Sequence, residues 1–262
     1  MSDSVLYSVD DRGVATVTLN RPEKHNAFDD ALIKELTNIF KQVGEDKNVR
    51  AMILAANGKS FCAGADANWM RRMSEYSFDQ NVADANALAN MLWELNYLPK
   101  PTIARVQGAA FGGAIGLIAC CDMAVGSKLS KFCLSEVKLG LIPATISPYV
   151  IAAMGARVAR RYFTTAEVFS ARRARRLGLL SETVTEEELD DTINDLIEHI
   201  LKNGPHATAA AKQLIFDVCD QPAEEELLEK TSLRIATIRV SEEGQEGLRA
   251  FLEKRSPSWR KE

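Results

Sequence analysis

A glycine-rich apolar run followed by an isolated acid is the part of the chain best suited to chemistry. The run extends from Gly108 to Cys121, fourteen consecutive apolar or glycine residues, and Asp122 closes it. It is shorter than the roughly twenty residues of a membrane span and predicts a buried helix. Gly112 and Gly113 leave the backbone open to a ligand, and a helix that starts there directs free N–H groups at it. Such an N-terminus can hold an anion or a developing oxyanion.

The isolated acid is Glu136, about fifteen residues beyond the run. Its apolar neighbours in the sequence are Phe132, Leu134, Val137 and Leu139. Burial among them would raise the pKa of the carboxyl and suit it to exchange a proton with a carbon atom near neutral pH. The residues alone leave open an alternative, an ion pair with Lys138 or a cap.

The cysteines and histidines give no support to metal or nucleophilic-serine chemistry. The five cysteines form no CxxC pair, and the three histidines are scattered and form no HExxH motif. Buried reduced thiols are therefore expected rather than disulfides or a metal site. No order of Ser, His and Asp indicates a nucleophilic serine.

The length and composition are typical of a soluble globular enzyme. The 262 residues suffice for one large domain, alone or with a smaller helical appendage. The formal net charge of -4 argues against nucleic-acid and anionic-membrane partners. The opening residues MSDSVLYSVDD are polar and acidic, unlike a secretory signal or a transit peptide, so we expect a cytoplasmic protein.

Strands and helices alternate in the first half of the chain. The apolar patterns predict strands over 5–9, 14–19, 51–55, 102–106, 123–125 and 132–134, and helices over 31–43, 67–73 and 78–98. Two small-residue loops follow strands, one at 58–66 and the other at the start of the apolar run. The turns at Gly64-Ala65 and Gly112-Gly113 can therefore face the same cleft.

Helices dominate beyond Pro143. Their predicted ranges are 146–154, 156–163, 171–177, 186–202, 207–218, 223–240 and 242–254. The class of structure changes near 166–187 without a low-complexity linker. We therefore predict an α/β core with the site over residues 1–190 and a helical C-terminal region over 191–262, packed on the core or on another subunit.

Seven arginines gather in the second half of the chain. They are Arg157, Arg160, Arg161, Arg172, Arg173, Arg175 and Arg176. A solvated helix face, with the side-chain stems covering apolar surface, is the preferred interpretation. A phosphate-binding or subunit-contact role is the alternative.

Five segments together resemble the enoyl-CoA hydratase/isomerase, or crotonase, superfamily. They are NRPEKHNAF (20–28), GKSFCAGAD (58–66), VQGAAFGGAIGL (106–117), FCLSEVKLGLIP (132–143) and EGLRAFLEKRSPSW (246–259). They occur in the family's order across nearly the whole chain. The resemblance implies an α/β fold, a crotonase-like spiral of repeated β-β-α units with a helical C-terminal trimerisation region. It also implies a homotrimer or a dimer of trimers.

The resemblance further implies an acyl-CoA thioester substrate and no separate cofactor, since coenzyme A is part of the substrate. The two backbone N–H donors to the thioester oxygen map to Ala65 and Gly113, and the family's second catalytic glutamate maps to Glu136. Residues matching the family's coenzyme A contacts are Lys24, Ala27, Ala63, Ala65, Asp66, Ala67 and Asn68.

One position departs from the family pattern. Hydratases with two catalytic acids carry a glutamate three residues after the position of Gly113, where this chain has Gly116. The segments around GGAIGLIACCDMAVG and GADANWM are nevertheless similar to bacterial methylglutaconyl-CoA and gamma-carboxygeranoyl-CoA hydratases. We therefore predict hydration of a branched or carboxylated enoyl-CoA. The alternatives are double-bond isomerisation by Glu136 alone and a non-catalytic acyl-CoA-binding homologue. Candidate polar groups for a substrate carboxylate are Asn68, Ser135, Thr145, Ser147 and Tyr149.

Overall fold

A six-stranded sheet forms the base of the fold in the computed structural model, which describes residues 4–260. Its strands, in spatial order, are β1 (Val5–Val9), β2 (Val14–Leu19), β3 (Ala51–Ala56), β4 (Thr102–Val106), β6 (Met123–Ser127) and β9 (Glu182–Val184). β1 and β2 are an antiparallel hairpin, and every later pair is parallel. Parallel strands covered on both faces read as continuous apolar runs, as the AMILAA of β3 does.

A second, three-stranded sheet alternates with the first along the chain. Its order is β5 (Ala109–Phe111), β7 (Lys131–Cys133) and β8 (Phe169–Ser170). β4 of the large sheet leads into β5 of the small one and then into helix α4 (Gly113–Cys120), and β6 leads likewise into β7. The chain thus winds as a spiral of β-β-α units, and the predicted fold is confirmed.

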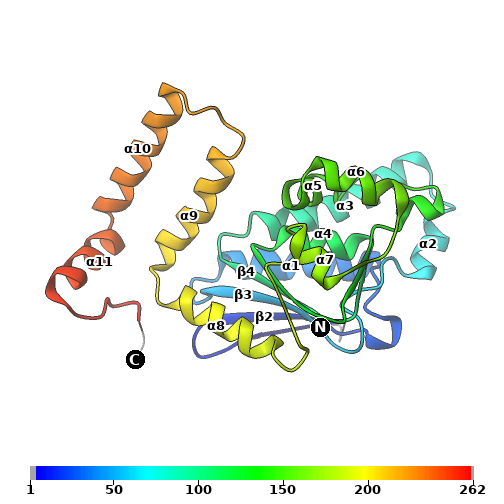
Figure 1. Cartoon of the computed structure of the whole chain (residues 1–262), viewed down its shortest axis with the longest axis horizontal. Coiled ribbons are helices and arrows are strands. Elements are labelled where there is room, and N and C mark those ends of the chain that lie inside the picture. Colours follow the sequence, from blue (N-terminus) through cyan, green and yellow to red (C-terminus); the bar gives the residue numbers. More distant parts are fainter. Residues whose placement is uncertain (1–3, 261–262) are drawn as a thin grey trace.

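Helices cover both faces of the large sheet (Figure 1). The other helices of this part are α1 (Asp30–Glu45), α2 (Ala67–Met73), α3 (Phe78–Asn96), α5 (Ser147–Met154), α6 (Ala156–Thr165) and α7 (Ala171–Arg176), with 3-10 turns η1 (Pro22–Lys24) and η2 (Glu136–Leu139). α1 begins where the side chain of Asp29 accepts the N–H of Leu32, as its sequence predicts. One apolar cluster joins α1, α3 and α4 to alternate residues of the strands, including Val17, Met52 and Ala104. The main core therefore lies between the sheet and these helices.

The opposite face of the sheet is covered by α8 (Leu189–Leu201). Leu189, Ile193 and Ile197 pack there against the other set of alternate strand residues, such as Ile103 and Val125. Because successive strand side chains point to opposite faces, one sheet supplies both clusters. The division predicted at residue 190 stays a prediction.

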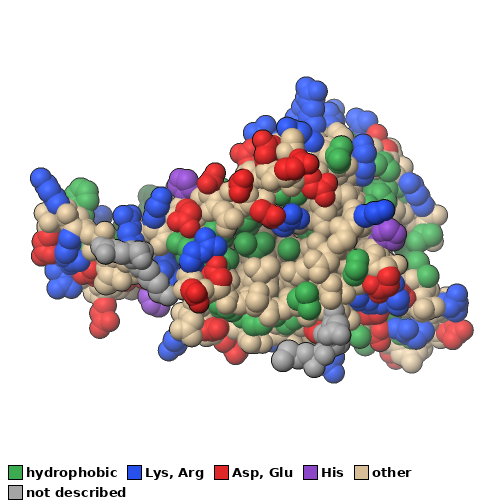
Figure 2. Space-filling view, turned by 90° about the horizontal axis from the view of Figure 1, so that it is seen from below, with side chains coloured by type: hydrophobic (Ala, Val, Ile, Leu, Met, Phe, Trp, Pro, Cys, Tyr) green, Lys and Arg blue, Asp and Glu red, His purple; other side chains and the backbone are tan. Residues whose placement is uncertain are grey.

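The last three helices leave this body as an arm. They are α9 (Pro205–Val218), α10 (Glu225–Val240) and α11 (Glu242–Glu253). Lys212 of α9 attaches the arm, since its ammonium lies 2.9 Å from a carboxylate oxygen of Asp122 and 3.1 Å from the carbonyl oxygen of Lys100. Figure 1 and the view from below in Figure 2 both show α10 and α11 projecting from the wider body.

The apolar run Gly108–Cys121 is a buried helix only in its second part. Residues 109–111 form β5, which pairs with β7, so a helix over the whole run was wrong. The helix starts at Gly113, which confirms the start predicted from the Gly112-Gly113 pair. Gly112 separates the two with φ 56° and ψ −126°, a backbone conformation that favours glycine. The short strands β5, β8 and β9 were not predicted.

Candidate functional site

Three chain segments lie side by side where the site was predicted. The N–H of Cys62 donates to the carbonyl oxygen of Ala109 over 3.1 Å, and the N–H of Phe111 returns a 3.0 Å bond to Cys62. The N–H of Gly112 then donates to Cys133 over 2.8 Å. The small sheet therefore brings the loop before Ala65, the turn at Gly112 and the segment before Glu136 together.

Phe28 connects the two glycine-rich turns. Its N–H donates to Gly64 over 2.8 Å, and its carbonyl oxygen accepts the N–H of Asp66 over 2.7 Å. A Cβ atom added at Gly113 would lie 3.3 Å from Cε2 of the same phenylalanine. Ala65, which pairs with Phe28 in an isolated bridge, and Gly113 are thus both neighbours of Phe28. That the two turns face one cleft stays a prediction.

The N–H groups of Ala65 and Gly113 are both available. Gly113 is the first residue of α4, so its N–H has no partner within the helix. No acceptor within residues 4–260 takes a hydrogen bond from either N–H. Two free donors, one of them at the positive end of a helix dipole, form an arrangement that can stabilise an oxyanion.

Glu136 lies beside Gly112, the residue that precedes the donor Gly113. Its Oε1 is 3.3 Å from the position that a Cβ at Gly112 would take, so only a glycine leaves that approach open. Its Oε2 is buried and has no hydrogen-bond partner in the part of the chain that the structure describes. Burial raises the pKa of this carboxyl, against a smaller opposing effect of a bond from its own backbone N–H. A carboxyl of this kind is suited to proton transfer near neutral pH.

The surroundings of Glu136 differ from the prediction in two respects. Leu139 is 64% exposed and so takes little part in burying the acid, whereas Phe132 and Leu134 are fully buried. Lys138 makes its contact with the sulfur of Cys133, at 3.9 Å, and forms no ion pair with Glu136 in the described chain. The ion pair that the sequence left open is therefore not found.

Asp66 holds the loop that carries Ala65. Its Oδ1 accepts the N–H groups of Asn68 and Trp69, at 2.8 and 3.3 Å, and so caps α2. Its Oδ2 lies 3.2 Å from the ammonium of Lys24. Burial of Asp66 acts to raise its pKa, but these hydrogen bonds and the charge of Lys24 outweigh it and lower the pKa. The structure thus brings two predicted coenzyme A contacts, Lys24 and Asp66, together.

Arg21 is a residue of this loop that sequence reasoning missed. Its guanidinium lies 2.5 Å from Asp29 and 3.5 Å from Asp66, and only 11% of its side chain is exposed. It therefore ties the first loop to both the start of α1 and the start of α2. The signal was present, because Arg21 stands within the NRPEKHNAF segment.

The other predicted contact residues surround the same loop. Ala27 is buried, Ala63 and Ala67 are exposed, and the N–H of Ala63 donates to His25 over 3.0 Å. Asn68 is exposed, and its side-chain oxygen accepts a 2.8 Å bond from Arg71. The exposed alanines offer backbone to a ligand without the obstruction of a long side chain.

Gly116 does not leave an empty space. A Cβ atom there would lie 2.3 Å from Cγ2 of Ile146 and 3.4 Å from Cδ2 of Leu92. Ile146 precedes α5 and is buried, so its side chain fills the volume beside Gly116. Sequence reasoning missed this residue because no local pattern connects positions 116 and 146.

The polar candidates for a substrate carboxylate are dispersed. The hydroxyl of Ser135 lies 3.9 Å from the Cβ position of Gly112, beside the site. Tyr149 instead lines a cavity with Cys120 and Lys212, at the other end of α4, and burial raises its pKa to about 12. The hydroxyl of Ser147 donates to the carbonyl of Ala144 over 2.7 Å. Ser135 is therefore the candidate that the geometry favours.

Comparisons with known proteins show which family the chain resembles. Residues 10–262 match the family model described as enoyl-CoA hydratase/isomerase. The chain belongs to the enoyl-CoA hydratase/isomerase family. Within this family, a crystal structure of an enoyl-CoA hydratase from Shewanella pealeana is 49% identical, with a TM-score of 0.95 over 98% of this chain and 96% of that one.

Curated relatives in the family carry out more than one reaction. The (E)-benzylidenesuccinyl-CoA hydratase of Thauera aromatica is 33% identical over 94% of this chain and 95% of its own length. The 1,2-epoxyphenylacetyl-CoA isomerase of Escherichia coli is 30% identical over 99% of both chains. Family membership therefore supports an enzyme with hydratase or isomerase activity on acyl-CoA thioesters.

The described chain holds neither a cluster of metal ligands nor a membrane-spanning helix. Across residues 4–260, no group of three or more His, Cys, Asp or Glu side chains gathers as metal ligands would. None of the helices described is long and apolar enough to cross a membrane.

Proposed function

We propose that this chain adds water to the 2,3 double bond of a branched or carboxylated enoyl-CoA thioester. The observation that carries the proposal is the buried, unpartnered Oε2 of Glu136 beside Gly112, next to the free N–H groups of Ala65 and Gly113. A proton carrier and two oxyanion donors on neighbouring chain segments are the groups that the reaction needs.

In the proposed mechanism, the thioester oxygen accepts hydrogen bonds from Ala65 and Gly113. When water adds at carbon 3, the electrons of the double bond move toward the carbonyl and give an enolate, whose charge these donors stabilise. Each donor contributes about 3 kcal/mol to lowering such a barrier. Glu136 takes the proton of the attacking water and returns it to carbon 2. Because one carboxyl serves both steps, the two new bonds form on the same face of the substrate.

The proposed substrate follows from the single acid. Ile146 and Leu92 line the place beside Gly116 with apolar groups, so the protein offers no second carboxylate there to orient the water. A substrate with a free carboxylate of its own can supply that function, and Ser135 can hold it. The sequence resemblance to methylglutaconyl-CoA and gamma-carboxygeranoyl-CoA hydratases motivates this choice of substrate class. The name of the Thauera relative, (E)-benzylidenesuccinyl-CoA hydratase, supports it.

Coenzyme A is proposed to lie along the loop that begins at Lys24. The side chain of Lys24 is 44% exposed, so its ammonium can reach a phosphate while it contacts Asp66. Ala27, Ala63, Ala67 and Asn68 are the remaining proposed contacts, and no separate cofactor is invoked.

Double-bond isomerisation is the second candidate. The apolar side chains of Ile146 and Leu92 beside Gly116 favour it, because they offer no polar group to hold a water. An isomerase needs Glu136 to move a proton between two carbons and needs no water. The Escherichia coli relative is named an isomerase. A non-catalytic acyl-CoA-binding protein is less well supported, since Glu136 and both donor turns are intact.

Product analysis in heavy-oxygen water separates these candidates. Enoyl-CoA esters with and without a distal carboxylate would be incubated with the protein in this water, and the masses of the products would be measured by mass spectrometry. Hydration introduces the label into the product, whereas isomerisation changes the position of the double bond without it. We expect labelled product, formed faster from the carboxylated esters. Unlabelled isomer alone would contradict the hydratase proposal.

We also infer that the arm assembles the chain into a homotrimer or a dimer of trimers. α10 contains no buried residue, and apolar side chains of the arm face solvent, among them Leu233, Val240, Phe251 and Leu252. Monomers rarely leave such a series uncovered, and a second copy of the chain is the occupant we propose. A cytoplasmic location stays a prediction.

A further inference from the structure

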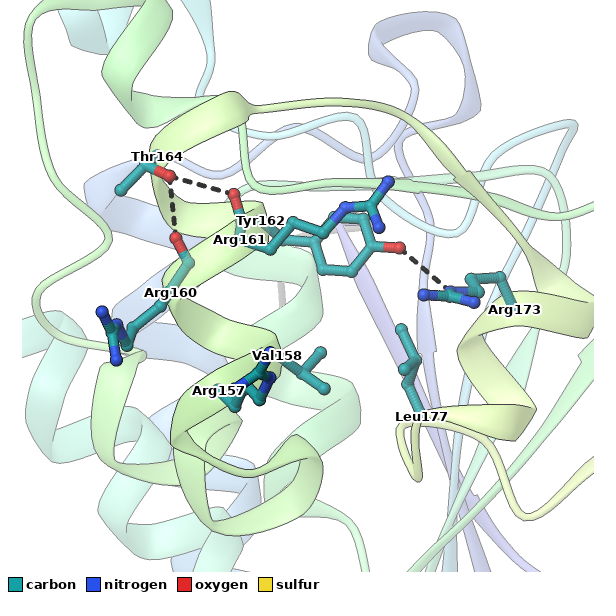
Figure 3. A pocket seen from close by; sticks show the side chains of 8 residues that line it. All are labelled: Arg157, Val158, Arg160, Arg161, Tyr162, Thr164, Arg173 and Leu177. Atoms are coloured by element: carbon teal, nitrogen blue, oxygen red, sulfur yellow. Dashed lines mark hydrogen bonds between the residues drawn. The ribbon is translucent and has the colours of Figure 1, made fainter.

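The arginines around the pocket between α6 and α7 do not form one anion site (Figure 3). The pocket has a volume of about 700 Å³, and arginines of both helices line it. Figure 3 shows the side chain of Arg160 pointing away from Arg173 across α6. The guanidinium of Arg161 is already paired with the carboxylate of Glu167. Most of the seven arginines are exposed, so this surface fits the solvated helix face preferred from the sequence.

Helix α2, which begins two residues after the proposed donor Ala65, is held to the core by one buried side chain. Of residues 67–87, which comprise α2 and the first half of α3, only Trp69 is buried, with 5% of its surface exposed. α2 also forms an ion pair between Arg72 and Asp30, but both side chains are exposed, and pairs of this kind contribute little. The orientation of α2 therefore depends mainly on where the Trp69 ring lies.

Trp69 forms hydrogen bonds through both its backbone and its side chain. Its backbone N–H donates to Oδ1 of Asp66 over 3.3 Å. Its indole Nε1–H donates to Oδ1 of Asp84, in α3, over 3.0 Å. A buried indole N–H without an acceptor is costly, so the carboxylate of Asp84 determines where the ring lies. Because Asp66 follows Ala65 directly, Trp69 connects the loop of this donor to α3.

The face of α3 that carries Asp84 also packs beside α4. Asp84, Leu88 and Leu92 follow one another at intervals of four residues and therefore lie on one face of the helix. Leu88 and Leu92 pack in the main apolar cluster. Cδ2 of Leu92 lies 3.4 Å from the place that a Cβ at Gly116 of α4 would take. Since α4 begins at Gly113, contacts through Trp69 and α3 link the loop of one donor to the helix that carries the other.

We propose that Trp69 and Asp84 are positioning residues that set the distance between the two oxyanion donors. The inference rests on the proposed function only in that Ala65 and Gly113 bind the thioester oxygen, a role that hydration and isomerisation share. Neither Trp69 nor Asp84 touches the substrate in this proposal. Because both donors must reach the same oxygen, a small displacement of α2 lowers turnover and leaves acyl-CoA binding largely intact.

Asp84→Leu tests the proposal, because it removes the acceptor and keeps a side chain of similar size. In steady-state kinetics on the preferred enoyl-CoA, kcat should fall about tenfold or more and KM should change less than about threefold. Asp84→Asn keeps a side-chain oxygen that can accept the indole N–H, so it should retain at least about half of the turnover. Asp79→Leu makes the same change at an exposed position of the same helix, and its turnover should stay within about twofold.

Trp69→Phe removes the same hydrogen bond from the other partner. Because the two residues are proposed to act through one bond, Trp69→Phe combined with Asp84→Leu should lose no more turnover than the weaker of the two single variants. Losses that multiply in the double variant would overturn the proposal. If Asp84→Leu did not fold, Trp69→Phe would carry the same comparison of kcat and KM.

Amide hydrogen exchange, followed by mass spectrometry, gives a readout that does not depend on activity. Exchange over residues 64–70 should be faster in Asp84→Leu than in Asp84→Asn and Asp79→Leu, while peptides from α1 should be unchanged. Unchanged exchange, turnover equal to that of Asp79→Leu, or a rise in KM alone would overturn the proposal. Unlabelled isomer in heavy-oxygen water would contradict hydration but not this inference, since the same variants can then be compared by their rate of isomerisation.

Discussion

The spiral core and the C-terminal arm solve the problem of apolar surface in opposite ways. In the core, helix α1 buries Leu36 and Phe40 completely against the sheet of the same chain. In the arm, α11 leaves Phe251 and Leu252 81% and 77% exposed. A single chain therefore places the proposed oxyanion donors and Glu136, whereas the exposed apolar surface of the arm is where we propose that a second copy packs. Activity and assembly should respond separately to substitutions in the two regions.

The largest effect is expected from Glu136→Gln in the core. The amide keeps the size of the side chain but cannot accept and return a proton, so turnover should fall about 10²- to 10⁴-fold. Steady-state kinetics on the preferred enoyl-CoA measures this fall, and calorimetry with a saturated acyl-CoA should show unchanged binding. Glu187→Gln, which makes the same change at an exposed position, is the control. Unchanged turnover in Glu136→Gln would refute the assignment of the acid.

Gly113→Pro should have the next largest effect, because it removes one proposed oxyanion donor. Proline is tolerated at the first position of a helix, where the N–H has no intrahelical partner. Loss of one such donor lowers turnover about 10²- to 10³-fold. Gly113→Ala is the control, since it adds a Cβ near Phe28 but keeps the N–H. A similar loss in both variants would attribute the effect to crowding rather than to the donor.

The arm should lose its proposed partner when Phe251→Asp and Leu252→Asp are combined. Burying unpaired carboxylates in an interface is costly, so the dissociation constant of the assembly should rise at least about 100-fold. Light scattering on eluted peaks measures the mass of the particle. Leu129→Asp is the matched control, because Leu129 lies outside the arm and is 73% exposed. A monomeric wild-type protein would remove the distinction between core and arm.

Most of the spiral could be predicted because its elements carry local patterns. The strand at 14–19 and helix α1 follow the periods of two and 3.6 residues, and Asp29 marks the start of the helix. Strands β8 and β9, of two and three residues, are too short to show a period. An apolar run also cannot be told from a buried strand by composition, which is why residues 109–111 were assigned to a helix.

The sequence predicted which residues make up the candidate site, but not which side chains pack around them. The segments around Ala65, Gly113 and Glu136 carry the family resemblance, and the small sheet brings them together. Ile146 was missed because its contact with Gly116 joins residues distant in the chain. Packing between distant residues leaves no periodic signal in the sequence. The contact of Ile146 and Leu92 with Gly116 could therefore be identified only from the structure.

Gly116→Glu tests the contact between Gly116 and Ile146, and it should reduce the stability of the protein more than it changes activity. Its Cβ alone would lie 2.3 Å from Ile146, and overpacking of this kind costs about 1–3 kcal/mol. Adding Ile146→Gly removes the obstruction and should restore part of the lost free energy of unfolding in urea titrations. If a second acid is what the site lacks, the double variant should also gain hydration of crotonyl-CoA. Equal destabilisation by the single and double variants would show that Ile146 is not the obstruction.

The smallest effect is expected on the pH dependence of stability, through the carboxyl of Glu136. Burial raises the pKa of Glu136 above 4.5 in the folded protein, so the folded state prefers the protonated acid. The charged carboxylate is destabilising once the pH exceeds the raised value, and the penalty disappears below the unfolded value. Glu136→Gln should therefore raise Tm by about 1–4 °C at pH 8 and by less at pH 5. Scanning calorimetry at both values measures the difference. A gain that does not depend on pH would mean that the buried charge is not its source, whereas the expected dependence would show that the buried, unpartnered carboxylate of Glu136 lowers the stability of the fold.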